Sequence, residues 1–340
     1  LHYAITAKGT LDLTRIYQVF AIDQYSVKGK LGVDLVAKGN QADALAGRYA
    51  SLANSGRIEF DQLELYTKEY PAPFLIPSGT ISFNQDKAWL KNTLLQYQQN
   101  TFNLNGYAQN FIGYAPLDQV LLGNLQVSSK KIVVDDFMAF AGSDSSTPAA
   151  ASGVVLLPTN LNLQLNAKVD AVQYGSTVLN NFAGQLVLNK GQLQLTDTKF
   201  QVAGGTFNLA ASYAPLNPQS ANFSFTVKAD SFDVKRAYKE IPLFREMASA
   251  AGKAAGRISL NYSLDGRLND QMAPVMPSIK GAGELTLADV QVSGLKLFSA
   301  VSKATGKDSL NKPNLKAVVL KSSIKNNLIT LQRTKMRIFG

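Results

Sequence analysis

Cysteine is absent from the 340-residue chain, and histidine occurs once, at His2. The lack of cysteine excludes disulfide bonds, thiolate metal sites and cysteine nucleophiles. A single histidine beside the first residue excludes a Ser-His-Asp triad, histidine-ligated zinc and most histidine acid–base chemistry. We therefore predict that the chain is not an enzyme, and that it has no catalytic residue, cofactor or metal.

Carboxylate chemistry has one tempting candidate, the pair Asp135 and Asp136. Neighbouring residues of a strand point to opposite faces, so these two carboxylates cannot share a substrate. Glycan hydrolysis needs two carboxylates that converge at roughly 5–10 Å, and no spacing in the sequence places such a pair. The two aspartates are interpreted as a solvated turn or the start of a helix.

Long hydrophobic runs are also missing. No apolar run approaches the roughly 18 residues of a membrane-spanning helix, and Val154–Leu157 is typical of the longest. The sequence begins at Leu1, without a methionine or a signal peptide, and ends in a strand-like run over 335–340. We therefore expect the chain to be a piece of a longer protein.

Basic residues outnumber acidic ones by 34 to 24, which gives a net charge of +10. They are scattered apart from doublets such as Lys130–Lys131, and no aromatic–basic pattern of nucleic-acid binding accompanies them. Nucleic acid is therefore not an expected partner. A solvated polar face is the simpler interpretation. Attraction to anionic lipid headgroups, worth about 1 kcal/mol for each nearby Lys or Arg, is the alternative.

What the chain does contain is one repeated phrase: glycine, any residue, apolar, any residue, apolar. Glycine tolerates the positive φ of tight turns, and the alternation that follows is typical of a strand with one apolar face. The phrase predicts a mainly β fold, an elongated, curved antiparallel sheet with a few short helices. It begins at Gly9, Gly56, Gly79, Gly123, Gly184, Gly191, Gly205, Gly256 and Gly283.

Three stretches interrupt the alternation with helical spacing, near 41–53, 233–254 and 295–303. Pro242 is expected to kink or split the second of these helices. The small polar residues 142–152 predict a linker or loop. This divides the sequence into an N-terminal β segment over 1–141 and a C-terminal β region over 153–340.

An internal repeat underlies the phrase. Residues 79–104 align without gaps with 184–209 at an offset of 105, nine of the 26 positions are identical, and both copies end in Thr-Phe-Asn-Leu. A tyrosine follows each copy, Tyr107 and Tyr213. Repetition of one β unit implies that each unit buries its apolar face against its neighbours or against something else.

The order of several short motifs resembles the AsmA family, in particular the AsmA-like proteins of Bacteroidota. The resemblance extends over nearly the whole chain, and none of the motifs is a catalytic signature. They are Tyr70-Pro71-Ala72-Pro73 before Gly79-Thr80-Ile81-Ser82-Phe83, Leu122-Gly123-Asn124-Leu125-Gln126-Val127-Ser128-Ser129 before Asp135-Asp136-Phe137-Met138, Leu157-Pro158-Thr159-Asn160-Leu161, and Phe232-Asp233-Val234-Lys235-Arg236-Ala237-Tyr238.

This resemblance implies a periplasmic protein that an N-terminal helix, absent here, anchors to the inner membrane. It also implies kinship with bridge-like lipid-transfer proteins, in which repeated β units form a long sheet with an apolar groove. The partner would be phospholipid or another envelope lipid, and the role would lie in cell-envelope biogenesis and outer-membrane assembly. The sequence gives no outer-membrane partner.

Alternating apolar residues are the candidate groove lining, and their role would be to solvate lipid tails. The same alternation fits the dry core of a β-sandwich, because it cannot distinguish a sheet that faces lipid from one that faces another sheet. A structural or adhesive β-repeat protein with a closed core is therefore the alternative. The candidate residues are Leu161, Leu163, Leu165, Leu186, Leu188, Leu193, Leu195, Phe207, Leu209, Phe223, Phe225, Ile258, Leu260 and Tyr262.

Overall fold

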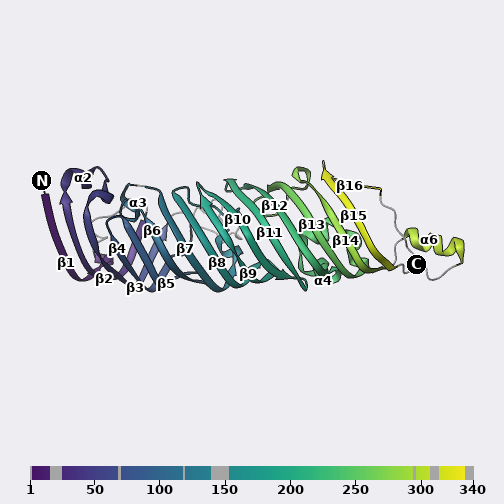
Figure 1. Cartoon of the computed structure of the whole chain (residues 1–340), viewed down its shortest axis with the longest axis horizontal. Coiled ribbons are helices and arrows are strands. Elements are labelled where there is room, and N and C mark those ends of the chain that lie inside the picture. The colour runs from purple at the N-terminus through teal and green to yellow at the C-terminus, as the bar shows by residue number, and fades with distance from the viewer. Residues whose placement is uncertain are drawn as a thin grey trace, which may run out of the picture.

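The computed structural model describes residues 2–15, 25–67, 70–117, 119–138, 153–293, 296–306 and 314–333. These residues form a single sheet of 16 strands, in which each strand is hydrogen-bonded only to its neighbours in the sequence. Figure 1 shows the strands slanting across a long, narrow ribbon, with β1 at one end and β15 and β16 at the other. The prediction of an elongated, curved, mainly β fold is therefore confirmed.

The strands are β1 (His2–Asp12), β2 (Tyr25–Asn40), β3 (Ala53–Thr67), β4 (Phe74–Asn84), β5 (Lys87–Tyr97), β6 (Asn100–Gln109), β7 (Leu121–Val133), β8 (Leu161–Tyr174), β9 (Thr177–Asn189), β10 (Gln192–Val202), β11 (Gly205–Asn217), β12 (Ser220–Asp233), β13 (Ala254–Leu268), β14 (Lys280–Val292), β15 (Asn314–Lys325) and β16 (Leu328–Leu331).

One pair of strands departs from the predicted antiparallel arrangement. Strands β7 and β8 are parallel, with Leu121 opposite Leu161 and Val133 opposite Gln173. Parallel neighbours need a connection that returns the chain to the side from which it came, and of this connection the structure describes residues 134–138 and 153–160. All other neighbouring strands are antiparallel.

The strand ends form two long rims, which we name by their turns. The first rim holds the turns at 85–86, 190–191 and 218–219 together with the loop at 269–279, and the second rim holds the turns at 98–99, 175–176 and 203–204. Helices α2 (Gln41–Leu45) and α3 (Phe111–Leu117) lie at the first rim, whereas α4 (Val234–Glu240) lies at the second (Figure 1).

The internal repeat of the sequence is also a repeat of backbone geometry. Positive φ occurs at Gln85, Asn92 and Gln98, and again 105 residues later at Lys190, Asp197 and Ala203. The middle residue of each set is a β-bulge, because the strand register shifts there. Bulges bend a strand and increase its twist, so they curve the sheet at matching places in both copies.

A glycine meets a buried threonine beside each of these bulges. A Cβ atom on Gly79 would lie 2.8 Å from Thr93 Cγ2, and one on Gly184 would lie 2.9 Å from Thr198 Cα. Both threonines are at most 2% exposed. The glycine of the repeated phrase is therefore required here by close approach between strands, and its φ is not positive at either position.

The helices agree with the predicted positions, and the first two are shorter than predicted. The expected helix over 233–254 is split at Pro242 into α4 and α5 (Pro242–Met247), followed by a 3₁₀ turn over Ser249–Lys253. Residues 41–53 give only α2 and a 3₁₀ turn over Tyr49–Ser51, and α6 spans Lys296–Thr305. None of the described helices has the length and apolarity to cross a membrane. The predicted linker 142–152 lies outside the described residues.

Candidate functional site

All 14 predicted lining residues lie on one face of the sheet, which we call the inner face. The cross-strand register establishes this, since Leu163 is opposite Leu188, Leu186 is opposite Leu195, and Tyr213 is opposite Phe223. Residues directly opposite on neighbouring strands project to the same side. The structure thus brings into one continuous apolar surface residues that are up to 101 positions apart, from Leu161 to Tyr262.

This surface is only partly covered. Five of the 14 residues are buried, namely Leu163, Leu188, Phe207, Ile258 and Tyr262. The other nine keep an intermediate exposure. Hydrophobic side chains that remain partly accessible along a whole sheet face are the feature that a closed sandwich core lacks.

One covered part of the inner face lies toward the second rim, where phenylalanines stack across consecutive strands. The ring centroids of Phe182 and Phe200 are 6.5 Å apart, those of Phe200 and Phe207 are 5.6 Å apart, and those of Phe207 and Phe232 are 5.2 Å apart. Phe244 of α5 completes the row against Phe232 at 5.9 Å. Helices α4 and α5 therefore cap this side of the inner face.

A second aromatic cluster covers the second rim in the N-terminal half. Tyr97 is fully buried and contacts three rings, with centroids at 4.6 Å for Phe74, 5.1 Å for Phe137 and 5.5 Å for Tyr70. Phe137 belongs to the 3₁₀ turn over Val134–Phe137, where the chain leaves β7. The repeat unit thus packs aromatic rings toward the same rim in both halves.

Residues 153–160, which we call the return segment, run along the first rim and over the inner face. Val154 N–H donates to Pro218 O at 2.9 Å, and the Val154 residue is 0% exposed. Tyr213 of β11, on the inner face, donates its hydroxyl to Val155 O at 2.7 Å. Tyr70, from the loop between β3 and β4 at the second rim, donates to Leu156 O at 3.1 Å. The segment therefore bridges the open side of the curved sheet.

The two rims also meet directly. Tyr174 is the last residue of β8, at the second rim, and its hydroxyl lies 3.3 Å from Met272 O and 3.4 Å from Gln271 O. Both acceptors belong to the loop at 269–279 of the first rim. A sheet whose opposite rims share hydrogen bonds is curved enough to enclose its inner face here. We call Tyr70, Tyr174 and Tyr213 the tyrosine clasp.

Burial raises the pKa of Tyr213 above its ordinary value, and the neighbouring Tyr174 and Tyr70 add to this effect, while the bond to Val155 opposes it. A tyrosine whose pKa is higher in the folded than in the unfolded protein contributes to stability below the unfolded pKa of about 10. That contribution is lost as the pH rises above the unfolded pKa, because the unfolded protein then loses the phenol proton more readily than the folded protein does. We expect the wild-type chain to lose more stability than Tyr213→Phe between pH 9 and pH 11. Urea unfolding at both pH values measures this, and equal losses would contradict a buried phenol.

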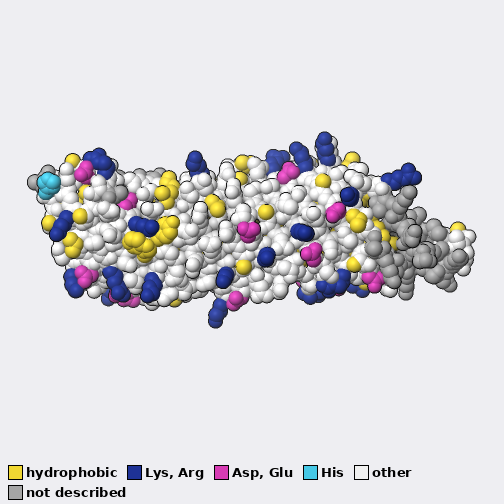
Figure 2. Space-filling view, viewed as in Figure 1, with side chains coloured by type: hydrophobic (Ala, Val, Ile, Leu, Met, Phe, Trp, Pro, Cys, Tyr) yellow, Lys and Arg dark blue, Asp and Glu magenta, His cyan; other side chains and the backbone are white. Residues whose placement is uncertain are grey.

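The opposite, outer face is polar. Along β8 its residues are Asn162, Gln164, Asn166, Lys168 and Asp170, all exposed. Figure 2, which views one side of the molecule, shows isolated charged side chains of both signs on a largely uncharged polar surface. This distribution agrees with the interpretation of the scattered basic residues as a solvated polar face.

The carboxylates of the two aspartates considered for catalysis accept hydrogen bonds from a backbone N–H group and from a side-chain amide. Asp135 Oδ2 accepts Gly175 N–H at 2.9 Å, and Asp136 Oδ2 accepts from Asn100 Nδ2 at 2.7 Å. Both lie in the 3₁₀ turn over Val134–Phe137, as the turn interpretation predicted. No group of three or more metal-ligating side chains occurs among the residues with a described position.

Sequence reasoning missed the tyrosine clasp and the return segment. Tyr213 had a signal, because a tyrosine follows both copies of the repeat, but Tyr70 and Tyr174 had none that alternation reveals. Comparison of the chain with family models, curated proteins and solved structures gives no match in any of the three. The function must therefore be argued from the inner face itself.

Proposed function

We propose that the chain binds the acyl chains of envelope lipids along its inner face, as a periplasmic lipid-transfer module in outer-membrane biogenesis that an N-terminal helix anchors to the inner membrane. The observation that carries the proposal is the partly exposed apolar surface that continues through neighbouring strands from β8 to β13. The location, the anchor and the envelope role rest on the resemblance to the AsmA family alone.

The energetic argument concerns the water that a lipid tail would otherwise meet. Each buried methylene is worth about 0.8 kcal/mol. Transfer of a tail of roughly 16 carbons from a membrane into water therefore costs about 12 kcal/mol of free energy. A continuous apolar face offsets most of that cost and needs no catalytic group. This fits the absence of cysteine and the single histidine of the sequence.

The dimensions support an extended ligand. Sixteen strands have 15 gaps, and at about 4.8 Å each the sheet is roughly 70 Å long. One leaflet of hydrocarbon is about 15 Å thick, so the inner face is long enough for several tails end to end. Between the caps at the second rim and the return segment at the first rim, Leu186, Leu195 and Phe225 remain partly exposed.

Native mass spectrometry of the purified chain, with lipid extraction, tests the proposal. We expect phospholipid to co-purify with the wild type, and the double variant Leu195→Asp/Leu209→Asp to lose it, because two carboxylates on the inner face would have to enter hydrocarbon.

The matched control is Gln194→Asp/Ala210→Asp. It adds the same charges to the same two strands on the outer face, where both residues are exposed. We expect it to retain bound lipid. Wild-type protein that carries no lipid and takes up none from vesicles would instead favour a structural or adhesive β-repeat protein with a closed core.

A further inference from the structure

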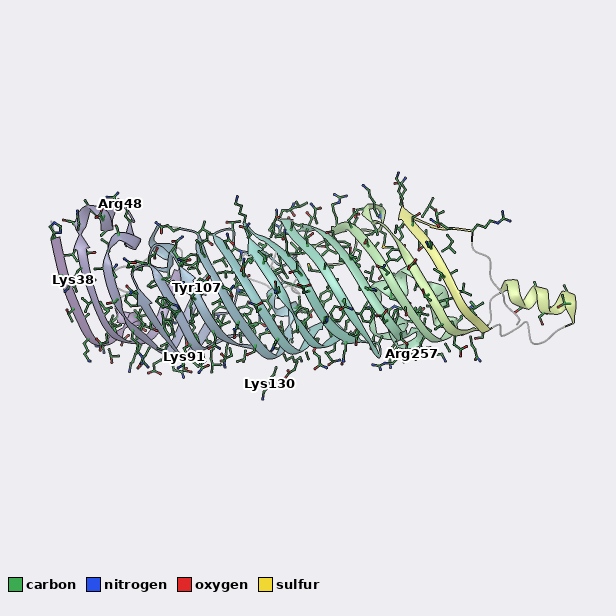
Figure 3. All side chains as sticks on the ribbon, viewed as in Figure 1. Lys38, Arg48, Lys91, Tyr107, Lys130 and Arg257 are labelled. Carbon is green, nitrogen blue, oxygen red and sulfur yellow. The ribbon has the colours of Figure 1, made fainter. Side chains whose placement is uncertain are left out.

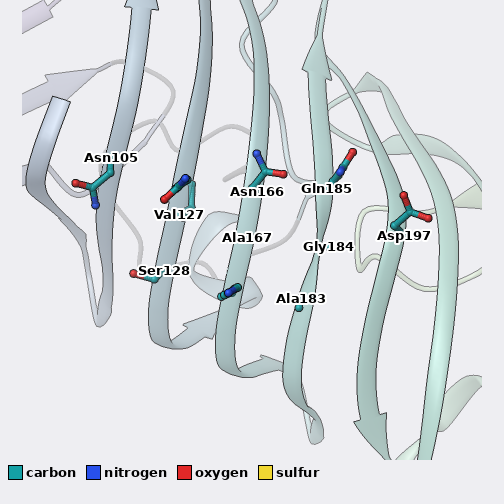
Figure 4. A pocket seen from close by; sticks show the side chains of 11 residues that line it. Asn105, Val127, Ser128, Asn166, Ala167, Ala183, Gly184, Gln185 and Asp197 are labelled. Atoms are coloured by element: carbon teal, nitrogen blue, oxygen red, sulfur yellow. The ribbon is translucent and has the colours of Figure 1, made fainter. Parts of the chain in front are cut away.

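A second concave region lies on the outer face, away from the proposed lipid surface. It has a volume of about 450 Å³ and crosses strands β6 to β10. Figure 4 shows amide and carboxylate side chains from successive strands standing side by side along it. Because this hollow is on the opposite face of the sheet, a ligand bound there would not contact the proposed lipid surface.

Four amide side chains form one row through this hollow. Asn105 is directly opposite Gln126, Gln126 is opposite Asn166, and Asn166 is opposite Gln185. Neighbouring strands are about 4.8 Å apart. The four amide-bearing positions are therefore spaced by about 4.8 Å from one strand to the next. We call these four residues the amide row.

The hydrogen-bonding capacity of the amide row is largely unused. Among the described residues, the side chains of Gln126, Asn166 and Gln185 make no protein hydrogen bond, and each offers two donors and an acceptor. Asn105 is held in place, since its Oδ1 accepts the N–H of the bulge residue Asn92 at 2.8 Å. The row therefore presents one amide that is held in place and three whose donors and acceptors are available at the exposed surface.

Charge at the hollow is balanced. Lys168 and Asp197 are its only lining residues that carry charge. A polyanion such as nucleic acid requires several basic side chains, and an apolar ligand would leave the amides unpaired. A peptide strand is excluded because these strands already pair on both sides.

Two aromatic side chains lie near one end of the amide row, in the next row of the outer face. Tyr107 lies two residues from Asn105 on β6, and Trp89 is opposite it on β5. Trp89 is 42% exposed, and Lys87 Nζ lies 4.0 Å from the Tyr107 ring centroid and 5.5 Å from that of Trp89. Figure 3 places Tyr107 on the viewed side of the sheet. An exposed aromatic ring beside free amides offers a stacking surface as well as hydrogen bonds.

We propose that the outer face of β5–β10 binds an extended, uncharged glycan. Hydroxyl groups both donate and accept hydrogen bonds, which matches the amide row. The apolar faces of sugar rings match the exposed Trp89, and the repeat of an extended pyranose chain is close to the spacing of the strands. The chain direction is across the strands, from β5 toward β10.

The experiment uses Trp89 as the reporter, because it is the only tryptophan of the chain. The purified protein is titrated with chitotetraose and with cellotetraose while tryptophan emission is recorded. We expect a saturable change with half-saturation below about 1 mM, unaltered between 50 and 500 mM salt because the site is neutral.

The variant Gln126→Ala/Asn166→Ala should weaken binding at least tenfold. Both residues are exposed, so the fold is expected to be kept. The control Thr226→Ala/Ser263→Ala removes two hydroxyl groups from the outer face of β12 and β13, outside the hollow, and should bind as the wild type does. Emission that neither sugar alters, unchanged affinity in the amide variant, or binding confined to dextran sulfate at low salt would each overturn the proposal.

Discussion

Phe232→Ala is expected to destabilise the chain by about 3–5 kcal/mol, the usual cost of emptying a large aromatic site in a core. The Phe232 residue is 1% exposed, and its ring lies between Phe207 of the sheet and Phe244 of α5. Its loss opens a cavity where the helical cap joins the inner face, and neither the sheet nor the short helix can move far enough to close it.

Urea unfolding followed by far-ultraviolet circular dichroism measures this loss. Phe223→Ala is the matched control, because Phe223 lies on the same strand and face but is partly exposed. Its loss should be clearly smaller. A loss below about 1 kcal/mol for Phe232→Ala would show that α4 and α5 do not pack on the sheet in solution.

Asn100→Ala is expected to cost about 3 kcal/mol, although it removes only a small polar group. Asn100 is 0% exposed, its Oδ1 accepts Val133 N–H at 2.6 Å, and its Nδ2 donates to Asp136 Oδ2 at 2.7 Å and to Tyr97 O at 3.1 Å. Alanine leaves these partners without the amide at the point where the chain leaves β7. Each buried group so orphaned costs about 1–3 kcal/mol.

The same unfolding measurement applies, with Asn103→Ala as control. Asn103 is on the same strand, but within the described part of the chain its side chain makes a hydrogen bond with Asn105 alone. We expect a change within about 0.5 kcal/mol for the control. If the two variants lose equal stability, the side chain of Asn100 does not hold the turn after β7.

Much of the fold could be predicted because alternation and turns are local properties. The odd-numbered apolar residues from Leu161 to Val169 indicated the inner face of β8, and Pro242 marked the break between α4 and α5. The repeated spacing from 79–104 to 184–209 likewise predicted two equivalent strand sets. These features depend on backbone sterics and on side-chain period, both of which are visible within about ten residues.

The parallel pair β7–β8 and the tyrosine clasp could not be predicted in this way. Strand direction depends on the path of the chain between Val133 and Leu161, and alternation is the same for both directions. Tyr174 and Met272 are 98 positions apart, and they meet because the whole sheet curves. Long-range curvature is the sum of many bulges, and no single residue encodes it.

The strictly sequential strand order has a mechanical consequence. Because β1 and β16 lie at opposite ends of the sheet, a tension applied between them acts across the strands and peels their hydrogen bonds one strand at a time. The parallel pair is different, because β7 ends at the second rim and β8 begins at the first rim. The return segment and the tyrosine clasp therefore connect the two rims of the sheet in this region. They divide the sheet into two groups of strands that can be extended separately under tension.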